Sequence, residues 1–353
     1  MKSFKIYKTS NLNPPISNLK SPISNLKPQT QKDMSERTDL TQFAERIDLL
    51  RQQISQVIVG QDENIDLLLT AVLANGHVLL EGVPGVAKTL LARLLARLID
   101  AKFSRVQFTP DLMPSDVLGT NVFNIKTSDF DFHPGPVFAD LVLVDEINRA
   151  PAKTQAALFE VMEERQVTID GTTHAMGQFY TILATQNPVE QEGTYKLPEE
   201  QTDRFMMKIT MGYPSFDEEV TILERHHVNQ RLTALEDIEP VITKQQLIEL
   251  RQMLNEVFVD PAILRYMAGI VQQTRQSKAV FLGASPRASV ALLQASKAYA
   301  LLQGRDFVTP DDVRQVAPSI LQHRIILTAE AEMEGITPQR AVQRLIEKVE
   351  VPK

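Results

Sequence analysis

Short apolar runs alternate with amphipathic segments through the first half of the chain. Residues 40–56 carry apolar side chains at helical spacing, and a short loop leads from them into a second helix that ends near residue 74. Runs that are apolar at nearly every position are typical of parallel strands buried on both faces. The pattern therefore predicts a five-stranded, doubly wound parallel α/β domain with crossover helices. The predicted strands are His77–Glu81, Phe103–Phe108, Leu141–Val144, Phe179–Thr185 and Met206–Met211.

The pattern changes after residue 213 to consecutive helices with explicit start signals. Thr243 stands three residues before Gln246, which is the spacing of a capping box. Three further sites place an N-cap residue directly before a proline, which is favoured at the first helical position. These sites are Asp260-Pro261, Ser285-Pro286 and Thr309-Pro310. Residues 214–353 are therefore predicted to form a smaller, all-helical domain.

The first 33 residues differ in character from everything that follows. Residues 15–20 read PISNLK and recur word for word at 22–27, in a segment rich in Ser, Asn, Pro and Lys. Such a composition buries too little apolar surface to order itself. Two interpretations stay open, a disordered tail and a translation start at Met34 that leaves the repeat untranslated. We divide the chain into this tail at 1–37, an α/β domain at 38–213 and a helical domain at 214–353.

Composition narrows the classes of function. The chain has no cysteine, which excludes disulfide scaffolds, thiolate metal sites and thiol nucleophiles. It has no apolar run near the roughly 18 residues that a membrane span requires, so we expect a cytoplasmic protein. The net charge is −7, and residues 34–353 carry −12 because the first 33 residues hold six lysines and one acid. That acidity disfavours nucleic acid as a partner.

A phosphate-binding loop follows the first predicted strand. Residues 82–89 read GVPGVAKT, which matches the motif G-x-x-x-x-G-K-S/T except that Ala87 replaces the second glycine. In such a loop, backbone N–H groups curl around phosphates, Lys88 reaches the β- and γ-phosphates, and the Thr89 hydroxyl binds Mg²⁺. Alanine costs little there if its φ angle is negative. The residues predicted to contact a nucleotide are Gly82, Pro84, Gly85, Val86, Ala87, Lys88, Thr89 and Leu90.

Polar residues at other strand ends complete the predicted site. Asp145 and Glu146 end a buried strand, where Asp145 would hold Mg²⁺ through water and Glu146 would orient or deprotonate the attacking water. Asn187 ends the next strand and is placed to hold that water or the γ-phosphate; an Asn-Pro turn is the alternative. Arg287 stands in the first turn of a helix, where a cation opposes the helix dipole. Either a phosphate or an ion pair with an acid would explain it.

With these motifs the sequence resembles the MoxR family of AAA+ ATPases, from about residue 40 to residue 345. The resemblance is carried by EGVPG at 81–85, FHPGPVF at 132–138, DEINRAP at 145–151, ATQNP at 184–188 and GASPRA at 283–288. It implies an AAA+ sheet of five parallel strands followed by a helical lid. It also implies that Lys88 with Thr89 form the Walker A pair and Asp145 with Glu146 the Walker B pair.

Further roles come from the same resemblance. Asn187 corresponds to sensor 1 and Arg287 to sensor 2, while Val59 and Gly60 match the loop that borders adenine. Arg204 matches the arginine finger that reaches the ATP of a neighbouring subunit. From the residues alone, an ion pair with a nearby acid would be the preferred reading of Arg204. The acids close to it in sequence are Glu199, Glu200 and Asp203.

The family also carries two inserted hairpins, expected here at 119–136 and 167–174. Asp170-Gly171 is in addition a strong hairpin-turn signal by itself. In relatives such loops face the pore of a ring or a partner. Arg149 stands where it would touch a neighbouring subunit or cap a surface helix, and both readings stay open.

The resemblance implies an ATP-hydrolysing chaperone that works as a homo-oligomeric ring, expected to be a hexamer. ATP and Mg²⁺ would lie between the α/β domain and the lid, contacted by both. The client would be a protein complex, and in relatives it often carries a von Willebrand A domain. The alternatives are a nucleotide switch with little turnover and, disfavoured by the charge, a DNA-associated motor.

Overall fold

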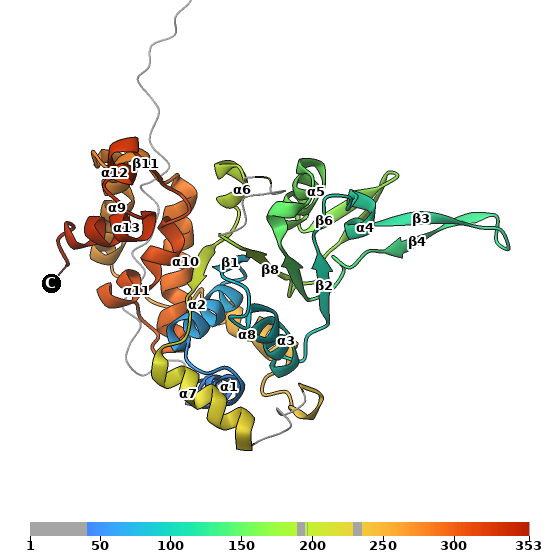
Figure 1. Ribbon diagram of the computed structural model, residues 1–353, viewed down its shortest axis with the longest axis horizontal. Coiled ribbons are helices and arrows are strands. Elements are labelled where there is room, and N and C mark those ends of the chain that lie inside the picture. The colour runs from blue at the N-terminus through green and yellow to red at the C-terminus, as the bar shows by residue number, and fades with distance from the viewer. Residues whose placement is uncertain (1–40, 189–194, 196, 229–234, 353) are drawn as a thin grey trace, which may run out of the picture. The chain divides into compact units, whose positions relative to one another are not determined.

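The protein is described by a computed structural model that covers residues 41–188, 195, 197–228 and 235–352 (Figure 1). The predicted tail at 1–37, with its repeat and the alternative start at Met34, lies outside the described residues. Among the helices within this range, none combines the length and the apolar character that a membrane crossing demands.

Five parallel strands form the central sheet in the order β2–β5–β8–β1–β9. They are β1 (Val78–Gly82), β2 (Phe103–Gln107), β5 (Leu141–Asp145), β8 (Thr181–Gln186) and β9 (Met207–Met211). All five predicted strands are confirmed, with ends that move by one or two residues. The first strand in the chain, β1, lies between the last two strands of the sheet, β8 and β9. The loop after β1 therefore lies at the same edge of the sheet as the carboxyl ends of β5 and β8. Ligands of open α/β sheets bind at this edge.

Helices cover both faces of the sheet because its strands are apolar on both sides. Leu80 and Leu143 join one hydrophobic cluster, whereas their neighbours Leu79 and Val144 join the other, as the alternation of side chains in a strand requires. Figure 1 shows α2 and α3 on one side of the sheet and α5 on the other. The helices of these two layers are α1 (Thr41–Val57), α2 (Asp62–Leu73), α3 (Lys88–Leu98), α4 (Pro114–Leu118) and α5 (Ala152–Glu164).

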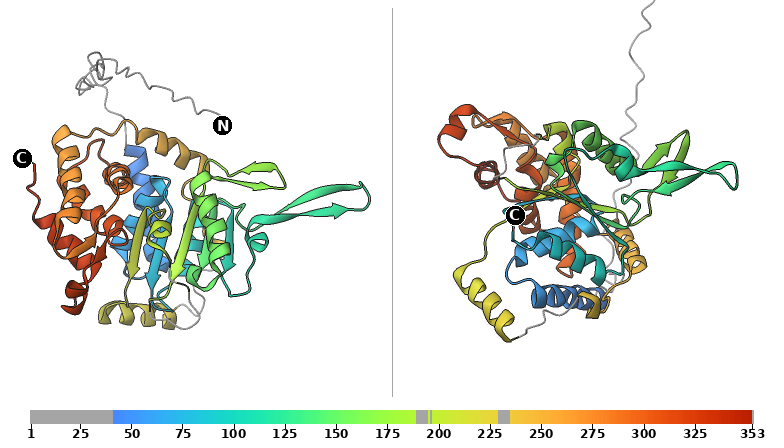
Figure 2. Two further views of the ribbon diagram at one scale, coloured as in Figure 1. Left: turned by 90° about the horizontal axis from the view of Figure 1, so that it is seen from above. Right: turned by 45° about the vertical axis from the view of Figure 1, so that its right-hand side comes forward.

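Two hairpins extend from the α/β region, and both were predicted. They are formed by β3 (Gly119–Asn124) with β4 (Asp129–Pro134), and by β6 (Gln166–Ile169) with β7 (Thr172–Ala175). Asp170 and Gly171 have φ angles of 48° and 83°, as the tight turn of a two-residue hairpin needs. The hairpins touch each other, because Asn121 donates to Asp170 at 2.7 Å and the rings of Phe132 and His174 stack 4.0 Å apart. Figure 2 shows them side by side.

Helices dominate the chain after residue 213. They are α7 (Phe216–Val228), α8 (Lys244–Met253), α9 (Pro261–Gln276), α10 (Pro286–Leu302), α11 (Pro310–Leu321), α12 (Ala329–Met333) and α13 (Pro338–Glu347). Shorter pieces are α6 (Glu199–Thr202), the 3-10 turns η3 (Ile147–Arg149) and η4 (Leu235–Asp237), and a ribbon of β10 (Val280–Leu282) with β11 (Ile326–Leu327). Both α8 and α10 pack against α2, and the described residues from Thr41 onward form one compact unit. The predicted boundary at 213/214 stays a prediction.

The start signals of these helices act largely as predicted. Thr243 takes part in a complete capping box, and the side chains of Asp260 and Thr309 accept hydrogen bonds from backbone N–H groups of their helices. Ser285 stands at the N-cap of α10, but its hydroxyl donates to the Asp203 carboxylate at 3.1 Å instead of capping the helix. This hydrogen bond links the lid to the segment before β9.

Candidate functional site

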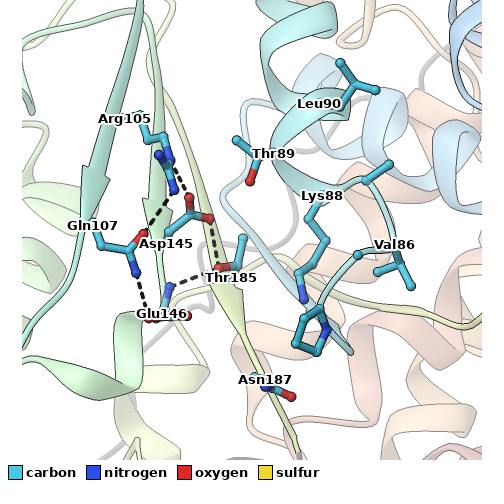
Figure 3. Close-up of a pocket in the computed structure, with 13 residues that line it drawn as sticks. Val86, Lys88, Thr89, Leu90, Arg105, Gln107, Asp145, Glu146, Thr185 and Asn187 are labelled. Carbon is cyan, nitrogen blue, oxygen red and sulfur yellow. Dashed lines mark hydrogen bonds and ion pairs between the residues drawn. The ribbon is translucent and has the colours of Figure 1, made fainter.

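The loop between β1 and α3 borders a cavity of about 390 Å³ at the carboxyl ends of the strands (Figure 3). Gly85 has a φ angle of 90°, a conformation that favours glycine. Ala87 has a φ angle of 60° and is therefore left-handed as well. Alanine would cost little here only with a negative φ angle, and that condition is not met. The left-handed conformation costs an L-residue about 1–2 kcal/mol.

Lys88 begins α3 and folds back over its own loop. Its Nζ donates to the carbonyl of Gly82 and, at 3.2 Å, to that of Val83. Position 82 requires a glycine, because a Cβ there would lie 2.6 Å from the carbonyl oxygen of Met211 in the neighbouring strand. The loop thus places a cation and the N-terminus of a helix at one wall of the cavity, which suits an anion.

Asp145 ends β5 at the opposite wall and is almost fully buried. Its Oδ2 accepts from Arg105 Nε at 2.6 Å, and its Oδ1 accepts from the Thr185 hydroxyl at 3.1 Å. Thr185 Oγ1 in turn accepts from the backbone N–H of Glu146 at 3.0 Å. These bonds satisfy the buried carboxylate oxygens and fix the orientation of the side chain.

Glu146 is the next residue and adopts a left-handed conformation, with a φ angle of 57°. Its Oε2 accepts from Gln107 Nε2 at 2.6 Å and pairs with Arg149 Nε at 3.2 Å. Gln107 also accepts from Arg105 Nη2 at 3.1 Å, so one chain of polar contacts joins the two acids. Strain in a non-glycine residue is a feature of functional sites. Arg149 thus pairs within its own chain, and its contact with a neighbouring subunit stays a prediction.

Most of the predicted nucleotide residues line this cavity. Those that do are Pro84, Gly85, Val86, Ala87, Lys88, Thr89, Leu90, Asp145, Glu146 and Asn187. Val59 and Gly60, in the loop before α2, are not among the residues that line it, and Gly82 takes part only through Lys88.

Sequence reasoning missed three lining residues, Arg105, Gln107 and Thr185. A signal for them existed. Arg105 and Gln107 are polar at alternate positions of β2, and Thr185 stands next to the last residue of β8. Ligands of such sheets bind outside the carboxyl ends of the strands, so polar side chains near those ends of the strands beside β5 are candidates for the same site.

Arg204 and Arg287 lie elsewhere, in a second cleft of about 370 Å³ beside α5 and α10. Both pair with one acid that sequence reasoning did not single out, Glu163. Arg204 Nη1 contacts Glu163 Oε2, and Arg287 Nη2 donates to Glu163 Oε1 at 2.8 Å. Arg287 thus forms an ion pair with an acid, and its contact with a phosphate stays a prediction.

The expectation that ATP lies between the α/β domain and the lid, contacted by both, stays a prediction. In the part of the chain that the structure describes, no residue after 213 lines the P-loop cavity. Burial and then the Arg287 cation lower the pKa of Arg204, which is consistent with two guanidinium groups held close together.

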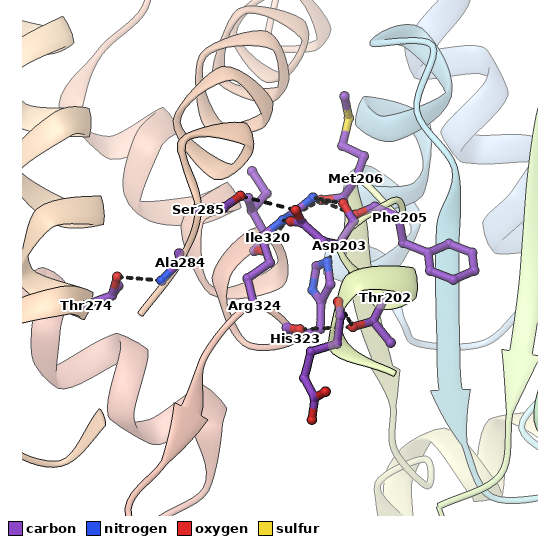
Figure 4. A network of polar contacts seen from close by, with 11 residues as sticks. Thr202, Asp203, Phe205, Met206, Thr274, Ala284, Ser285, Ile320, His323 and Arg324 are labelled. Atoms are coloured by element: carbon purple, nitrogen blue, oxygen red, sulfur yellow. Dashed lines mark hydrogen bonds and ion pairs between the residues drawn. The ribbon is translucent and has the colours of Figure 1, made fainter. Parts of the chain in front are cut away.

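The segment that carries Arg204 is anchored to the lid by a buried network (Figure 4). Arg324 is only 3% exposed; it pairs with Asp203 at 2.6 Å and donates to the carbonyls of Phe205 and Met206 at 2.7 and 3.0 Å. Burial, and then the Arg324 cation, hold the pKa of His323 well below its usual value, so this imidazole is neutral. Asp203 is thereby fixed from both sides, since Ser285 also donates to it.

Comparison with known proteins places this geometry in a family. Residues 77–207 match the model for the ATPase family associated with various cellular activities (AAA), and residues 272–345 match the AAA lid domain. The chain is 43% identical over 310 residues to the Chaperone MoxR1 of Mycobacterium tuberculosis, which covers 85% of this chain and 81% of that protein. It belongs to the MoxR family of AAA+ ATPases.

Two further similarities agree with this MoxR-family assignment. The uncharacterised protein YeaC of Bacillus subtilis is 50% identical over 301 residues, which cover 85% of this chain and 93% of YeaC. A crystal structure from Cytophaga hutchinsonii, described as a candidate ATPase, superposes with a TM-score of 0.81 at 40% identity and covers 89% of this chain and 97% of its own. The predicted AAA+ sheet with a helical lid is thus confirmed.

AAA+ membership implies a nucleotide and a divalent metal, and the residues present fit both. Within the described residues there is no group of three or more His, Asp or Glu side chains that would hold a metal alone. Mg²⁺ does not need one, because it binds one or two protein oxygens together with substrate phosphates and waters. The Thr89 hydroxyl and the Asp145 carboxylate, both lining the cavity, are oxygen donors of that kind.

Proposed function

We propose that this MoxR-family member hydrolyses ATP at the interfaces of a homo-oligomeric ring and uses the cycle to remodel or assemble protein complexes. One observation carries the proposal. Arg204 and Arg287 lie together on Glu163, outside the cavity that Lys88 and Asp145 border. A chain with its phosphate loop and its catalytic arginines in two different clefts needs a second copy to complete each site.

Within one chain, the P-loop cavity supplies the binding and activating groups. Lys88 would leave its loop carbonyls for the β- and γ-phosphates, a stronger acceptor for an ammonium group. Glu146, held by Gln107, would take the proton of the attacking water, and Asn187 would orient that water. Thr89, and Asp145 through water, would hold Mg²⁺, which neutralises charge that develops on the phosphates.

The neighbouring chain supplies the remaining charge. Arg204 would act as the arginine finger and Arg287 as a second cation on the γ-phosphate of the adjacent subunit. Such a finger contributes about 10³–10⁵ in rate, so turnover would depend on assembly. An interface between two different faces of the same chain closes into a ring when the rotation allows. The number of six subunits rests on the family resemblance.

A protein client is supported by the relative named a chaperone and by the exposed hairpin of β3 and β4. Phe123, Ile125 and Phe130 on this hairpin are 52%, 84% and 64% exposed, an unusual amount of apolar surface for one ribbon. The hairpin would meet the client. A client with a von Willebrand A domain rests on the family resemblance alone.

Mixing two inactive variants tests the proposal. Lys88→Ala cannot bind ATP but presents intact arginines, and Arg204→Ala binds ATP but lacks the finger. Each variant alone should show little turnover, whereas a one-to-one mixture should recover about a quarter of wild-type turnover, because random assembly completes one interface in four. Arg340→Ala, at an exposed position of α13, is the matched control and should retain full turnover. Failure of the mixture to recover any turnover would contradict shared sites, and a wild type that binds ATP without hydrolysing it would favour a nucleotide switch.

A further inference from the structure

Glu163 is the one carboxylate, in the part of the chain that the structure describes, shown to pair with both Arg204 and Arg287. It stands at the end of α5, one residue before the helix finishes. Its two oxygens are divided between the arginines, Oε2 for Arg204 and Oε1 for Arg287. The arginines come from distant parts of the chain, the loop before β9 and the first turn of α10. Glu163 is therefore the point at which the α/β region and the lid present their cations together.

The negative charge of Glu163 offsets the repulsion between the two arginines. Two guanidinium groups on one acid repel each other, and without a negative charge between them they would separate. Burial is the main cause that lowers the pKa of Arg204, and the nearby Arg287 cation lowers it further, as this repulsion requires. A single carboxylate between the two cations offsets it and sets the distance between them.

The two arginines differ in how firmly contacts other than Glu163 hold them. Arg204 is 23% exposed and its Nη1 also donates to the Phe159 carbonyl, one turn earlier in α5, at 3.2 Å. Asp203, beside it, is fixed by Arg324 and Ser285. Arg287 is 57% exposed, so its direction depends more on Glu163 than that of Arg204 does.

A guanidinium group has five N–H donors in a fixed fork. The contacts with Glu163 use one nitrogen of each arginine, and Arg287 is 57% exposed, so other N–H donors of its guanidinium group remain accessible. A phosphate is therefore able to bind both arginines while Glu163 stays in place behind them. Glu163 can stay paired with both arginines while they bind the phosphate.

We propose that Glu163 is a positioning residue that aligns Arg204 and Arg287 on one phosphate of the neighbouring subunit's ATP. This inference rests on the proposed function, since it assumes that the two arginines act across an interface. In this role Glu163 would contact neither ATP nor the attacking water. Its effect reaches the reaction only through the two arginines, in the same way as other groups that hold a catalytic side chain in its productive position.

The first test compares Glu163→Gln with Glu164→Gln, which removes the same charge from the next position of the same helix end. Loss of alignment should lower kcat of Glu163→Gln about 10- to 100-fold, as misplacement by about an ångström does. Its KM for ATP and its affinity for fluorescent ADP should stay at the wild-type values, because the P-loop cavity of its own chain is unchanged. Glu164→Gln should match wild type in all three. Glu163→Asp, which keeps the charge but shortens the reach, should lie between Gln and wild type.

The second test mixes Glu163→Gln with Lys88→Ala. Lys88→Ala presents Glu163 and both arginines intact, so the mixture should recover turnover as the Arg204→Ala mixture does. If Lys88→Ala recovers turnover when it is mixed with Arg204→Ala but not when it is mixed with Glu163→Gln, then Glu163 acts on the ATP site of its own chain. That result would overturn this inference while the proposed function stands. Recovery in neither mixture would overturn both. Wild-type kcat in Glu163→Gln, or a loss of ADP affinity equal to its loss of kcat, would also overturn the inference.

Discussion

Replacement of Ala87 by glycine tests the conformation of the phosphate loop. Ala87 has φ and ψ angles of 60° and 20°, in the left-handed region, directly before the lysine that begins α3. The loop needs this conformation to turn its backbone N–H groups toward a phosphate. An alanine therefore stores strain in the folded state that glycine would not.

The size of the effect follows from three contributions. Removal of the left-handed strain stabilises the folded state by about 1–2 kcal/mol. The greater backbone freedom of glycine in the unfolded chain costs about 0.5–1 kcal/mol. Ala87 is half-buried against the main core cluster, so its methyl group contributes part of the roughly 0.8 kcal/mol of a buried methylene. We expect Ala87→Gly to change the free energy of unfolding little, toward stabilisation.

Ala156→Gly provides the matched control, because Ala156 is exposed in the interior of α5. The unfolded-state cost is the same there, but no strain is relieved, so the free energy of unfolding should fall by about 0.8–1 kcal/mol. Urea denaturation of both variants without nucleotide gives the difference, which we expect to be about 1 kcal/mol in favour of Ala87→Gly. Equal destabilisation by the two substitutions would refute the reasoning.

Three other predictions follow from the structure. Glu146→Gln should bind ATP with wild-type affinity and stop turnover, because it keeps the cavity but removes the base; hydrolysis measured alongside ATP binding checks it. Asp203→Ala should lower the free energy of unfolding by about 3–5 kcal/mol, since it leaves the buried Arg324 without its carboxylate, and the exposed Asp217→Ala should not. Burial, followed by the Arg165 cation, lowers the pKa of His77 to about 3, so from about pH 6.5 down to pH 3 the unfolded chain binds a proton that the folded chain does not. His77 should by itself lower stability by about 1.4 kcal/mol per pH unit on acidification through that window, and buried His323 adds a slope of its own. His77→Gln should therefore reduce the slope measured by urea denaturation by about 1.4 kcal/mol per pH unit, and a slope that it leaves unchanged would contradict the assignment.

The sheet was predictable because its strands are buried on both faces. A run such as Leu141–Val144 is apolar at every position, and no other environment for a four-residue run fits as well. The phosphate loop and the acids after β5 were predictable for a related reason, since their chemistry is local in sequence. The turn at Asp170-Gly171 likewise follows from two adjacent residues.

The remaining features depend on contacts between distant residues. Arg105 reaches Asp145, 40 positions away in the sequence, only because β2 pairs with β5. Glu163 and Arg287 are separated by 124 positions, and no periodicity relates them. The φ angle of Ala87 is set by the shape of the whole loop rather than by alanine's own preference, so the motif alone did not show its cost.

In the proposed ring, each ATP site needs residues from two copies of the chain. ATP turnover per subunit, measured over a range of protein concentrations, tests it most directly. We expect turnover that is near zero at low concentration and rises to a plateau as subunits assemble, with Arg204→Ala low throughout because its rings lack the finger. Turnover per subunit that is constant over all concentrations, or wild-type turnover in Arg204→Ala, would show that one chain hydrolyses ATP without its neighbour.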